Sequence, residues 1–275
     1  MLQNPNHPAA ALRLKLALLF MAMLITAPAA VAQTFTDGDF TFEVTTDNTC
    51  KITGTTLTSG ELKIPAQASY NGNILSVTCI GDTAFKNLTN LTGALTIPDG
   101  ITGIDSNAFQ SCSGLTGPVT FPENLRYIMK YAFYGCTGLT GTLTLPDNLT
   151  YIGQSAFYGC TGLTGSLNLP ERMTYLGPGA FRDCTGFNGS LTLPKELPEI
   201  GDNTFVNCSS FTGSLTLPEN LTTIGKYAFY CCTGLTGSLK IPDGVTSIGT
   251  SAFYGCTGFN GTLTLGNSLT YVGYY

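Results

Sequence analysis

The residues best suited to chemistry are cysteines that stand 24 residues apart along the chain. The series consists of Cys112, Cys136, Cys160, Cys184, Cys208, Cys232 and Cys256. Zinc motifs place their cysteines two to four residues apart within a cluster and often include histidine. The cysteines of this series are farther apart and have no histidine near them in the sequence. Leu88 fills the same place in an earlier copy of the pattern, so the position suits an apolar side chain. We therefore predict buried free thiols that act as small apolar residues, and no metal site.

The remaining cysteines lie outside this series. Cys231 adjoins Cys232, so one of the two thiols is expected to face outward, where it can be oxidised. Cys50 and Cys79 lie nearer the N-terminus. In an oxidising compartment these two can form a disulfide, or both can stay free, and the sequence leaves both states open.

Catalytic constellations are hard to assemble from this chain. Its only histidine, His7, lies in a leader segment described below, so Ser-His-Asp and Cys-His arrangements fail in the rest of the chain. The acids recur at one turn of the repeat: Asp99, Glu123, Asp147, Glu171, Glu219 and Asp243. We expect them to solvate an edge of the fold, with weak calcium sites as the alternative. The sequence predicts no enzyme and no cofactor.

The first 32 residues have the composition of a secretory signal peptide. Basic residues precede an apolar run over 16–27, and Ala30-Val31-Ala32 supplies an A-x-A cleavage site. An uncleaved membrane anchor is the alternative, but the run is short and Pro28 ends it. We predict a signal peptide over 1–32, a secreted or cell-surface location, and no membrane span after its removal.

The chain that follows the leader is acidic, with 10 basic and 17 acidic residues and a net charge of −7. Proteins that bind nucleic acids neutralise phosphates with clusters of lysine and arginine, which are absent here. We therefore exclude a nucleic-acid partner.

The 24-residue step extends to other residue types. It is followed by Phe85, Phe109, Phe133, Phe157, Phe181, Phe205, Phe229 and Phe253. A fixed period of this length indicates a solenoid, in which each coil buries its apolar side chains against the neighbouring coils.

One unit shows how each coil is expected to fold. Leu143-Thr144-Leu145 alternates like a half-buried strand, and Pro146-Asp147-Asn148 ends it in a turn. Leu149-Thr150-Tyr151-Ile152 predicts a second extended piece. The apolar residues of 156–160 fit one face of a helical turn, which Gly162 is expected to end in a left-handed conformation.

The chain is expected to form one continuous domain. Residues 33–80 predict an N-terminal cap that includes the first repeat strand, at Leu62-Lys63-Ile64, and a hairpin turn at 70–73. Residues 81–275 predict the repeat solenoid. Atypical terminal units are normal, because the open end of a solenoid must be covered.

The repeat Leu-x-Leu-Pro-x-x-Leu-x-x-Ile-Gly-x-x-Ala-Phe-x-x-Cys-x-x-Leu resembles the BspA-like, or Treponema-type, leucine-rich repeats over about residues 60–275. The resemblance implies an α/β repeat solenoid: a right-handed leucine-rich-repeat arc with short strands on one face and short helical turns on the other. It also implies a surface or secreted protein, since some members are adhesins for host matrix proteins or other microbes.

The outward positions of the strands are the candidate binding surface. On the first strand they include Thr144, Asn168, Thr192 and Thr216, and on the second they include Tyr127, Tyr151 and Tyr175. Stacked coils should arrange each set in a column, in which residues of neighbouring coils are about 4.8 Å apart. Tyrosine offers rigid aromatic area with a polar tip, which suits contact with proteins or glycans. We predict an adhesin that recognises a protein on host or microbial surfaces.

Three other functions remain open. A polysaccharide-binding module would use the tyrosine column. An ice-binding protein would use flat columns of threonine, which Lys240 and Asn168 interrupt here. A structural surface repeat would bind no soluble ligand.

Overall fold

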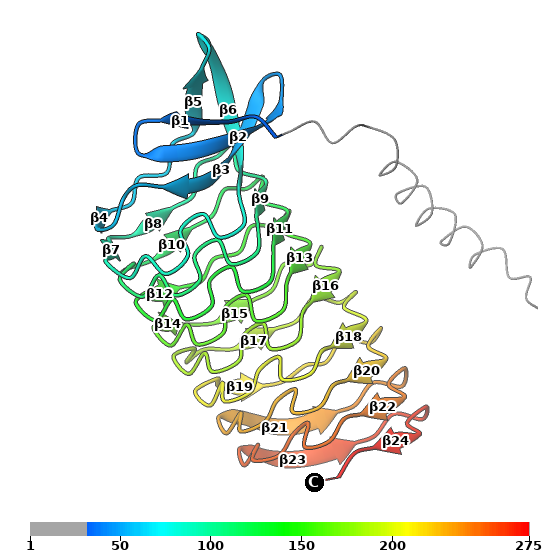
Figure 1. Cartoon of the computed structure of the whole chain (residues 1–275). Coiled ribbons are helices and arrows are strands. Elements are labelled where there is room, and N and C mark those ends of the chain that lie inside the picture. Colours follow the sequence, from blue (N-terminus) through cyan, green and yellow to red (C-terminus); the bar gives the residue numbers. More distant parts are fainter. Residues whose placement is uncertain (1–31, 275) are drawn as a thin grey trace, which may run out of the picture. The chain divides into compact units, whose positions relative to one another are not determined.

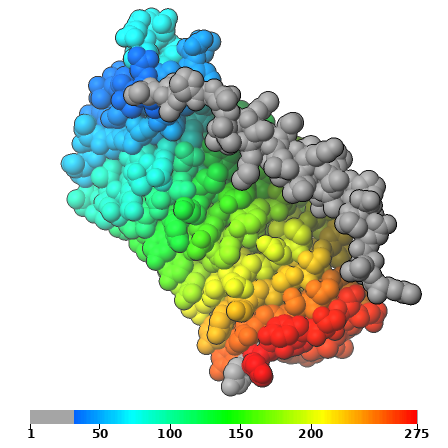
Figure 2. Space-filling view, turned by 45° about the vertical axis from the view of Figure 1, so that its right-hand side comes forward, coloured from blue at the N-terminus to red at the C-terminus, as the bar shows by residue number. Residues whose placement is uncertain are grey.

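The computed structural model describes residues 32–274, and the chain from Thr34 onward forms one compact unit. The predicted signal peptide falls almost entirely outside the described residues. Within the unit, successive coils follow one another in sequence order as neighbouring bands (Figure 2).

The N-terminal part is a small sheet with an added hairpin (Figure 1). Its strands are β1 (Thr34–Asp37), β2 (Phe40–Thr46), β3 (Thr49–Thr55), β5 (Gln67–Tyr70) and β6 (Asn73–Ile80). Strands β1, β2 and β3 pair antiparallel in that order, and β6 runs parallel to β3. Asn71 and Gly72 join β5 to β6 with φ values of 49° and 79°, as a two-residue hairpin turn requires. The predicted hairpin is confirmed.

The first repeat strand lies slightly earlier than predicted. Strand β4 (Gly60–Glu61) pairs in parallel with β7 (Leu91–Thr92), whereas Leu62-Lys63-Ile64 lies outside any strand. Leu62 is nevertheless buried, so the apolar pattern identified a core position rather than a ladder position.

The second extended piece of each coil forms the more continuous of the two strand stacks. Its strands are β9 (Gly103–Ile104), β11 (Tyr127–Ile128), β13 (Tyr151–Ile152), β16 (Tyr175–Leu176), β18 (Glu199–Ile200), β20 (Thr223–Ile224), β22 (Ser247–Ile248) and β24 (Tyr271–Val272). They pair in parallel and in register, and β9 continues the sheet from β6. The ladder is interrupted once, between β16 and β18.

The side that carries the Leu-x-Leu segments is paired only in parts. Its strands are β8 (Leu95–Thr96), β10 (Val119–Thr120), β12 (Gly141–Thr142), β14 (Leu163–Thr164), β15 (Leu167–Asn168), β17 (Leu191–Thr192), β19 (Gly213–Ser214), β21 (Leu235–Lys240) and β23 (Phe259–Thr264). They form β8–β10, β12–β14, β15–β17 and β19–β21–β23. On this side, backbone ladders therefore join the coils only in parts.

The third side of each coil is a run of turns, and the predicted helical turn is wrong, since no helix occurs in residues 32–274. The N–H of Phe157 donates to the carbonyl of Ala180 on the next coil at 2.8 Å, whereas the N–H of Tyr158 donates to Ser155, three residues back, at 3.2 Å. Left-handed φ values at Ser155 (51°) and Gly159 (70°) produce this alternation. A helix would keep these bonds within its own turn.

Gly162 does not have the left-handed conformation that was predicted for it. A Cβ at this position would overlap the carbonyl oxygen of Leu139 on the preceding coil. Glycine is needed here because the two backbones approach closely.

The core is a ladder of stacked phenylalanines. Phe157 is fully buried, and its ring lies 5.2 Å from that of Phe133 and 5.3 Å from that of Phe181, nearly parallel to both. Leucine and isoleucine from both strand segments close the core around this ladder. Each coil therefore buries its apolar side chains chiefly against its two neighbours.

Candidate binding surface

The structure brings the three candidate tyrosines into one parallel register. Tyr127 lies beside Tyr151, which lies beside Tyr175. The rings of Tyr151 and Tyr175 stack at 4.6 Å with an interplanar angle of 10°, and both side chains are half-buried. A face-to-face pair covers its own inner faces, so these two tyrosines offer ring edges and hydroxyls more than open ring faces.

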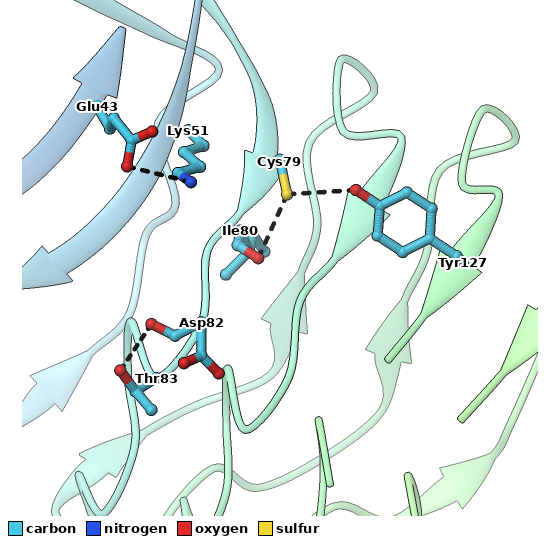
Figure 3. A network of polar contacts seen from close by, with 7 residues as sticks. All are labelled: Glu43, Lys51, Cys79, Ile80, Asp82, Thr83 and Tyr127. Carbon is cyan, nitrogen blue, oxygen red and sulfur yellow. Dashed lines mark hydrogen bonds and ion pairs between the residues drawn. The ribbon is translucent and has the colours of Figure 1, made fainter. Parts of the chain in front are cut away.

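Tyr127 is held differently. Its ring lies over Gly103, where a Cβ would overlap it, and its hydroxyl lies 3.6 Å from the Sγ of Cys79 (Figure 3). Burial raises the pKa of the Tyr127 phenol and raises the pKa of Cys79 to about 12. Tyr127 therefore fastens the first coils to the cap. One signal of this role is present in the sequence, a glycine at 103 where each of the next three coils has a tyrosine.

The strands beside this contact carry further polar groups. Lys51 and Glu43 form an ion pair at 3.1 Å (Figure 3), and burial raises the pKa of Asp105. Cys79 pairs across the sheet with Lys51, whereas Cys50 is buried in the core, and both thiols are free. Of the two states left open by the sequence, the structure has the one without a disulfide.

The column cysteines are buried as predicted, except that Cys256 is only partly buried, and all are free. Each thiol donates a hydrogen bond to the carbonyl of the phenylalanine 27 residues earlier; Cys136 reaches Phe109 at 3.0 Å and Cys184 reaches Phe157 at 3.0 Å. Burial raises the pKa of Cys112 to about 12. These thiols are poor nucleophiles and poor metal ligands, because both roles need the thiolate.

The candidate hydroxyl and amide side chains on the Leu-x-Leu side are all exposed: Thr144, Asn168, Thr192 and Thr216. Only Asn168 and Thr192 are partners in a parallel ladder. The structure thus places the predicted site residues on two different sheets, with the tyrosines on one and these four on the Leu-x-Leu side. Thr192 and Thr216 are brought together by a different feature, a groove.

This groove, the Thr192–Thr216 groove, lies between two coils and has a volume of about 500 Å³. Its lining residues include Ser190, Leu191, Thr192, Leu193, Ser214, Thr216 and Leu217, with Glu171, Lys195 and Glu219 at the proline turns. The Lys195 ammonium has no ion-pair partner within residues 32–274. The volume of the groove is within the range of ligand sites. The groove combines an apolar floor with exposed hydroxyls and one unpaired cation.

A lost ladder explains why the groove is open. The N–H of Leu167 donates to the Ser190 carbonyl at 2.9 Å, and β15 pairs with β17, but β17 and β19 form no ladder with each other. Without that pairing the two coils separate on this side. The sequence carried no clear signal for this separation.

A second irregularity lies in the same coil, on the tyrosine side. The N–H of Thr174 donates to Thr150 at 2.9 Å, but Pro198 has no N–H for the corresponding bond to Thr174. Here the ladder breaks, and the rings of Phe181 and Phe205 lie 6.0 Å apart. The coil that lines the groove thus lacks a ladder to one neighbour on each of its two strand-bearing sides.

The acidic turns do not form a cation site in the part of the chain that the structure describes, where no three histidine, cysteine or acidic side chains lie close enough to hold a metal ion. Glu219 instead pairs with Lys240 at 2.8 Å. None of the described segments is a helix with the length and apolar character needed to cross a bilayer.

Comparison with solved structures finds leucine-rich repeat proteins from bacteria. A leucine-rich repeat protein from Bacteroides ovatus is 23% identical, with a TM-score of 0.59 over 87% of this chain and 78% of that one. The leucine-rich repeat protein of T. pallidum is 24% identical, with a TM-score of 0.60 over 85% of this chain and 90% of that one. Both show a shared fold. No curated protein matches the chain.

The sequence itself carries the stronger likeness. The pattern of the BspA type leucine rich repeat region matches residues 62–188 and 187–275, in six copies. The matched part covers most of the chain, and the structure shows the stacked coils that such repeats form. The chain therefore belongs to the BspA type leucine rich repeat family.

Proposed function

We propose that this protein is a non-enzymatic adhesin, exported to the cell surface, that binds a protein ligand through the Thr192–Thr216 groove and the neighbouring Leu-x-Leu side. The observation that carries the proposal is the groove itself. It is the point where the exposed hydroxyls of Ser190, Thr192, Ser214 and Thr216 surround a space rather than cover a packed ladder.

Its chemistry suits a polypeptide. Leu191 and Leu217 give an apolar floor, and the hydroxyls can donate to or accept from backbone amides. Lys195 can pair with a carboxylate of the ligand, since its ammonium is unpaired within the described residues. A cluster of this kind at the centre of a larger contact is where binding energy concentrates.

A glycan ligand is a weaker proposal. Sugars bind aromatic residues through open ring faces, and the Tyr151–Tyr175 pair covers its inner faces by stacking. The pair remains useful for hydroxyl contacts at the margin of a protein interface, and this is the role we propose for it.

Immobilised protein incubated with host-cell-surface and matrix extracts tests the proposal. We expect a retained protein that is lost after protease treatment of the extract, persists after glycosidase treatment, and is lost from the double variant Thr192→Lys, Thr216→Lys. Loss after glycosidase treatment alone would favour the polysaccharide-binding function. No retained ligand from any extract would favour a structural surface repeat.

A further inference from the structure

Two clusters of three tyrosines recur on the turn side of the solenoid. The first cluster contains Tyr131, Tyr134 and Tyr158, and the second contains Tyr227, Tyr230 and Tyr254. Each member of the second follows its counterpart by 96 residues, which is four coils. Four strand spacings place the clusters roughly 20 Å apart.

The two clusters have the same geometry. Tyr131 meets Tyr134 edge-on at 5.9 Å and 72°, and Tyr227 meets Tyr230 at 5.7 Å and 67°. The stacked pairs also agree: Tyr134 with Tyr158 at 4.6 Å, and Tyr230 with Tyr254 at 5.1 Å. The same constellation is therefore built twice on one side of the molecule.

The fold does not need tyrosine at these places. Tyr131 and Tyr227 have left-handed φ values of 58° and 55°, which a bulky residue rarely adopts. Other coils meet the same requirement with small or tolerant residues: Asn107, Ser155, Gly179, Asn203 and Ser251. Tyr227 is 38% exposed, so the strained backbone is not compensated by complete burial.

The spacing has a symmetry that fits a second copy of the chain. A two-fold axis midway between the coils of Gly179 and Asn203 would place two antiparallel copies with cluster opposite cluster. The facing pairs would then be Tyr131–Ser251, Ser155–Tyr227, Gly179–Asn203, Tyr134–Tyr254, Tyr158–Tyr230 and Arg182–Val206. Each strained tyrosine faces a small serine, which is half-buried at 155 and buried at 251.

The charges beside the clusters agree with this pairing. The facing pairs in the row just before the left-handed residues would be Lys130–Thr250, Gln154–Lys226 and Pro178–Asp202. No two like charges meet, although two lysines are present in the row. The arrangement would also cover Tyr227 and Tyr254, which are exposed in a single copy.

We propose that the turn side, with its two tyrosine clusters, is an interface through which two copies of this chain pair antiparallel. It lies on a different side of the coil from the Thr192–Thr216 groove, so a pair can still present two grooves to ligand. Pairing would give two-site attachment to a surface, and with it avidity.

Sedimentation equilibrium over a range of concentrations tests the pairing. We expect a monomer–dimer equilibrium whose dissociation constant rises at least tenfold in Tyr131→Ser, Tyr227→Ser. Serine occupies the same left-handed position in two other coils, so this variant should fold and melt like the parent. Tyr151→Ser, Tyr175→Ser removes the same number of tyrosines from strands β13 and β16, away from the turn side, and should leave the dissociation constant unchanged.

A charge pair tests the antiparallel register. Thr250→Asp would face Lys130 of the other copy and should tighten the dimer, whereas Thr250→Lys should weaken it. A parent that is monomeric at its highest soluble concentration would overturn the proposal. So would a dimer that survives in Tyr131→Ser, Tyr227→Ser but is lost in Leu263→Lys, Val272→Lys, because those exposed apolar residues lie in the last described strands.

Discussion

Each column cysteine satisfies a backbone acceptor as well as filling the core. The thiol of Cys160 donates to the carbonyl of Phe133 at 3.2 Å, on the coil before it. A leucine at this position, as at Leu88, fills the space but leaves the carbonyl without this partner. The repeated cysteine thus joins neighbouring coils through weak S–H···O bonds in addition to packing.

Thiol reactivity should follow burial. Native alkylation with iodoacetamide at pH 7 should label Cys231 first, because it is half-buried and stands outside the hydrogen-bonded column. Cys112 should react slowly, since burial raises its pKa to about 12 and leaves almost no thiolate. Mass spectrometry after timed quenching measures the order. Rapid labelling of Cys112 or Cys136 in folded protein would contradict it.

The phenylalanine ladder should carry much more stability than the tyrosines beside it. Phe157→Ala should lower the free energy of unfolding by roughly 3–5 kcal/mol, because the cavity opens between two stacked rings. Tyr158→Ala should cost about 1 kcal/mol or less, since its ring is only half-buried. Urea unfolding of both variants decides, and equal losses would show that the inward and outward faces are assigned wrongly.

The three candidate tyrosines should not behave alike. Tyr127→Ala should cost about 2 kcal/mol, because the ring covers Gly103 and contacts Cys79. Tyr175→Ala should leave the melting temperature nearly unchanged. Thermal melts of the two single variants give the comparison. A Tyr175 variant as unstable as the Tyr127 variant would remove the distinction between the anchored tyrosine and the stacked pair.

At the scale of the coil, one proline changes the packing of the stack. Pro198 stands where neighbouring coils have Thr174 and Thr222. Those threonines bond the preceding coil through both N–H and Oγ1; Thr222 reaches Pro198 at 2.9 Å with each. Pro198 can do neither, so the sheet ends at β16 and resumes at β18.

Pro198→Thr should repair this break. The threonine of this variant can form two new hydrogen bonds to the Thr174 carbonyl, whereas loss of the proline increases the entropy of the unfolded chain. The net effect should be an increase of about 1 kcal/mol in the free energy of unfolding. Hydrogen exchange should slow in peptides that cover residues 196–201. Thr222→Pro is the matched reverse change and should create a second break. Unchanged exchange in the repaired variant would mean that some other contact separates β16 from β18.

The periodicity identified the coils, the phenylalanine ladder and the buried thiols, because each depends on a side chain that recurs at every step. It could not identify the turns beside Phe157. Three apolar residues at 156–160 fit one face of a helix. The left-handed conformations of Ser155 and Gly159 accompany backbone hydrogen bonds to the next coil, and these bonds have no pattern in the sequence of a single repeat. The groove was missed for a similar reason, since Leu191 matches the repeat but loses its partner across the coils.

For the whole molecule, the three sides of the coil have different roles. On the turn side, backbone hydrogen bonds join neighbouring coils on both sides of the β16–β18 break and across it. Across the break, the N–H of Phe181 donates to the Thr204 carbonyl at 3.0 Å. The tyrosine side opens once, at the coil that contains Pro198, and the Leu-x-Leu side is paired only in parts, with one of its breaks at the same coil, between β17 and β19. A continuous side can hold the stack together while an opened side receives a ligand.

The affinity of the retained protein ligand for two matched double variants decides whether the groove is the binding site. Thr192→Lys, Thr216→Lys fills the groove, whereas Thr96→Lys, Thr264→Lys adds the same charges at exposed positions of the same column outside it. We expect at least tenfold weaker binding, about 1.4 kcal/mol, for the groove variant alone. Equal affinity of both variants and the parent, in folded protein, would contradict it.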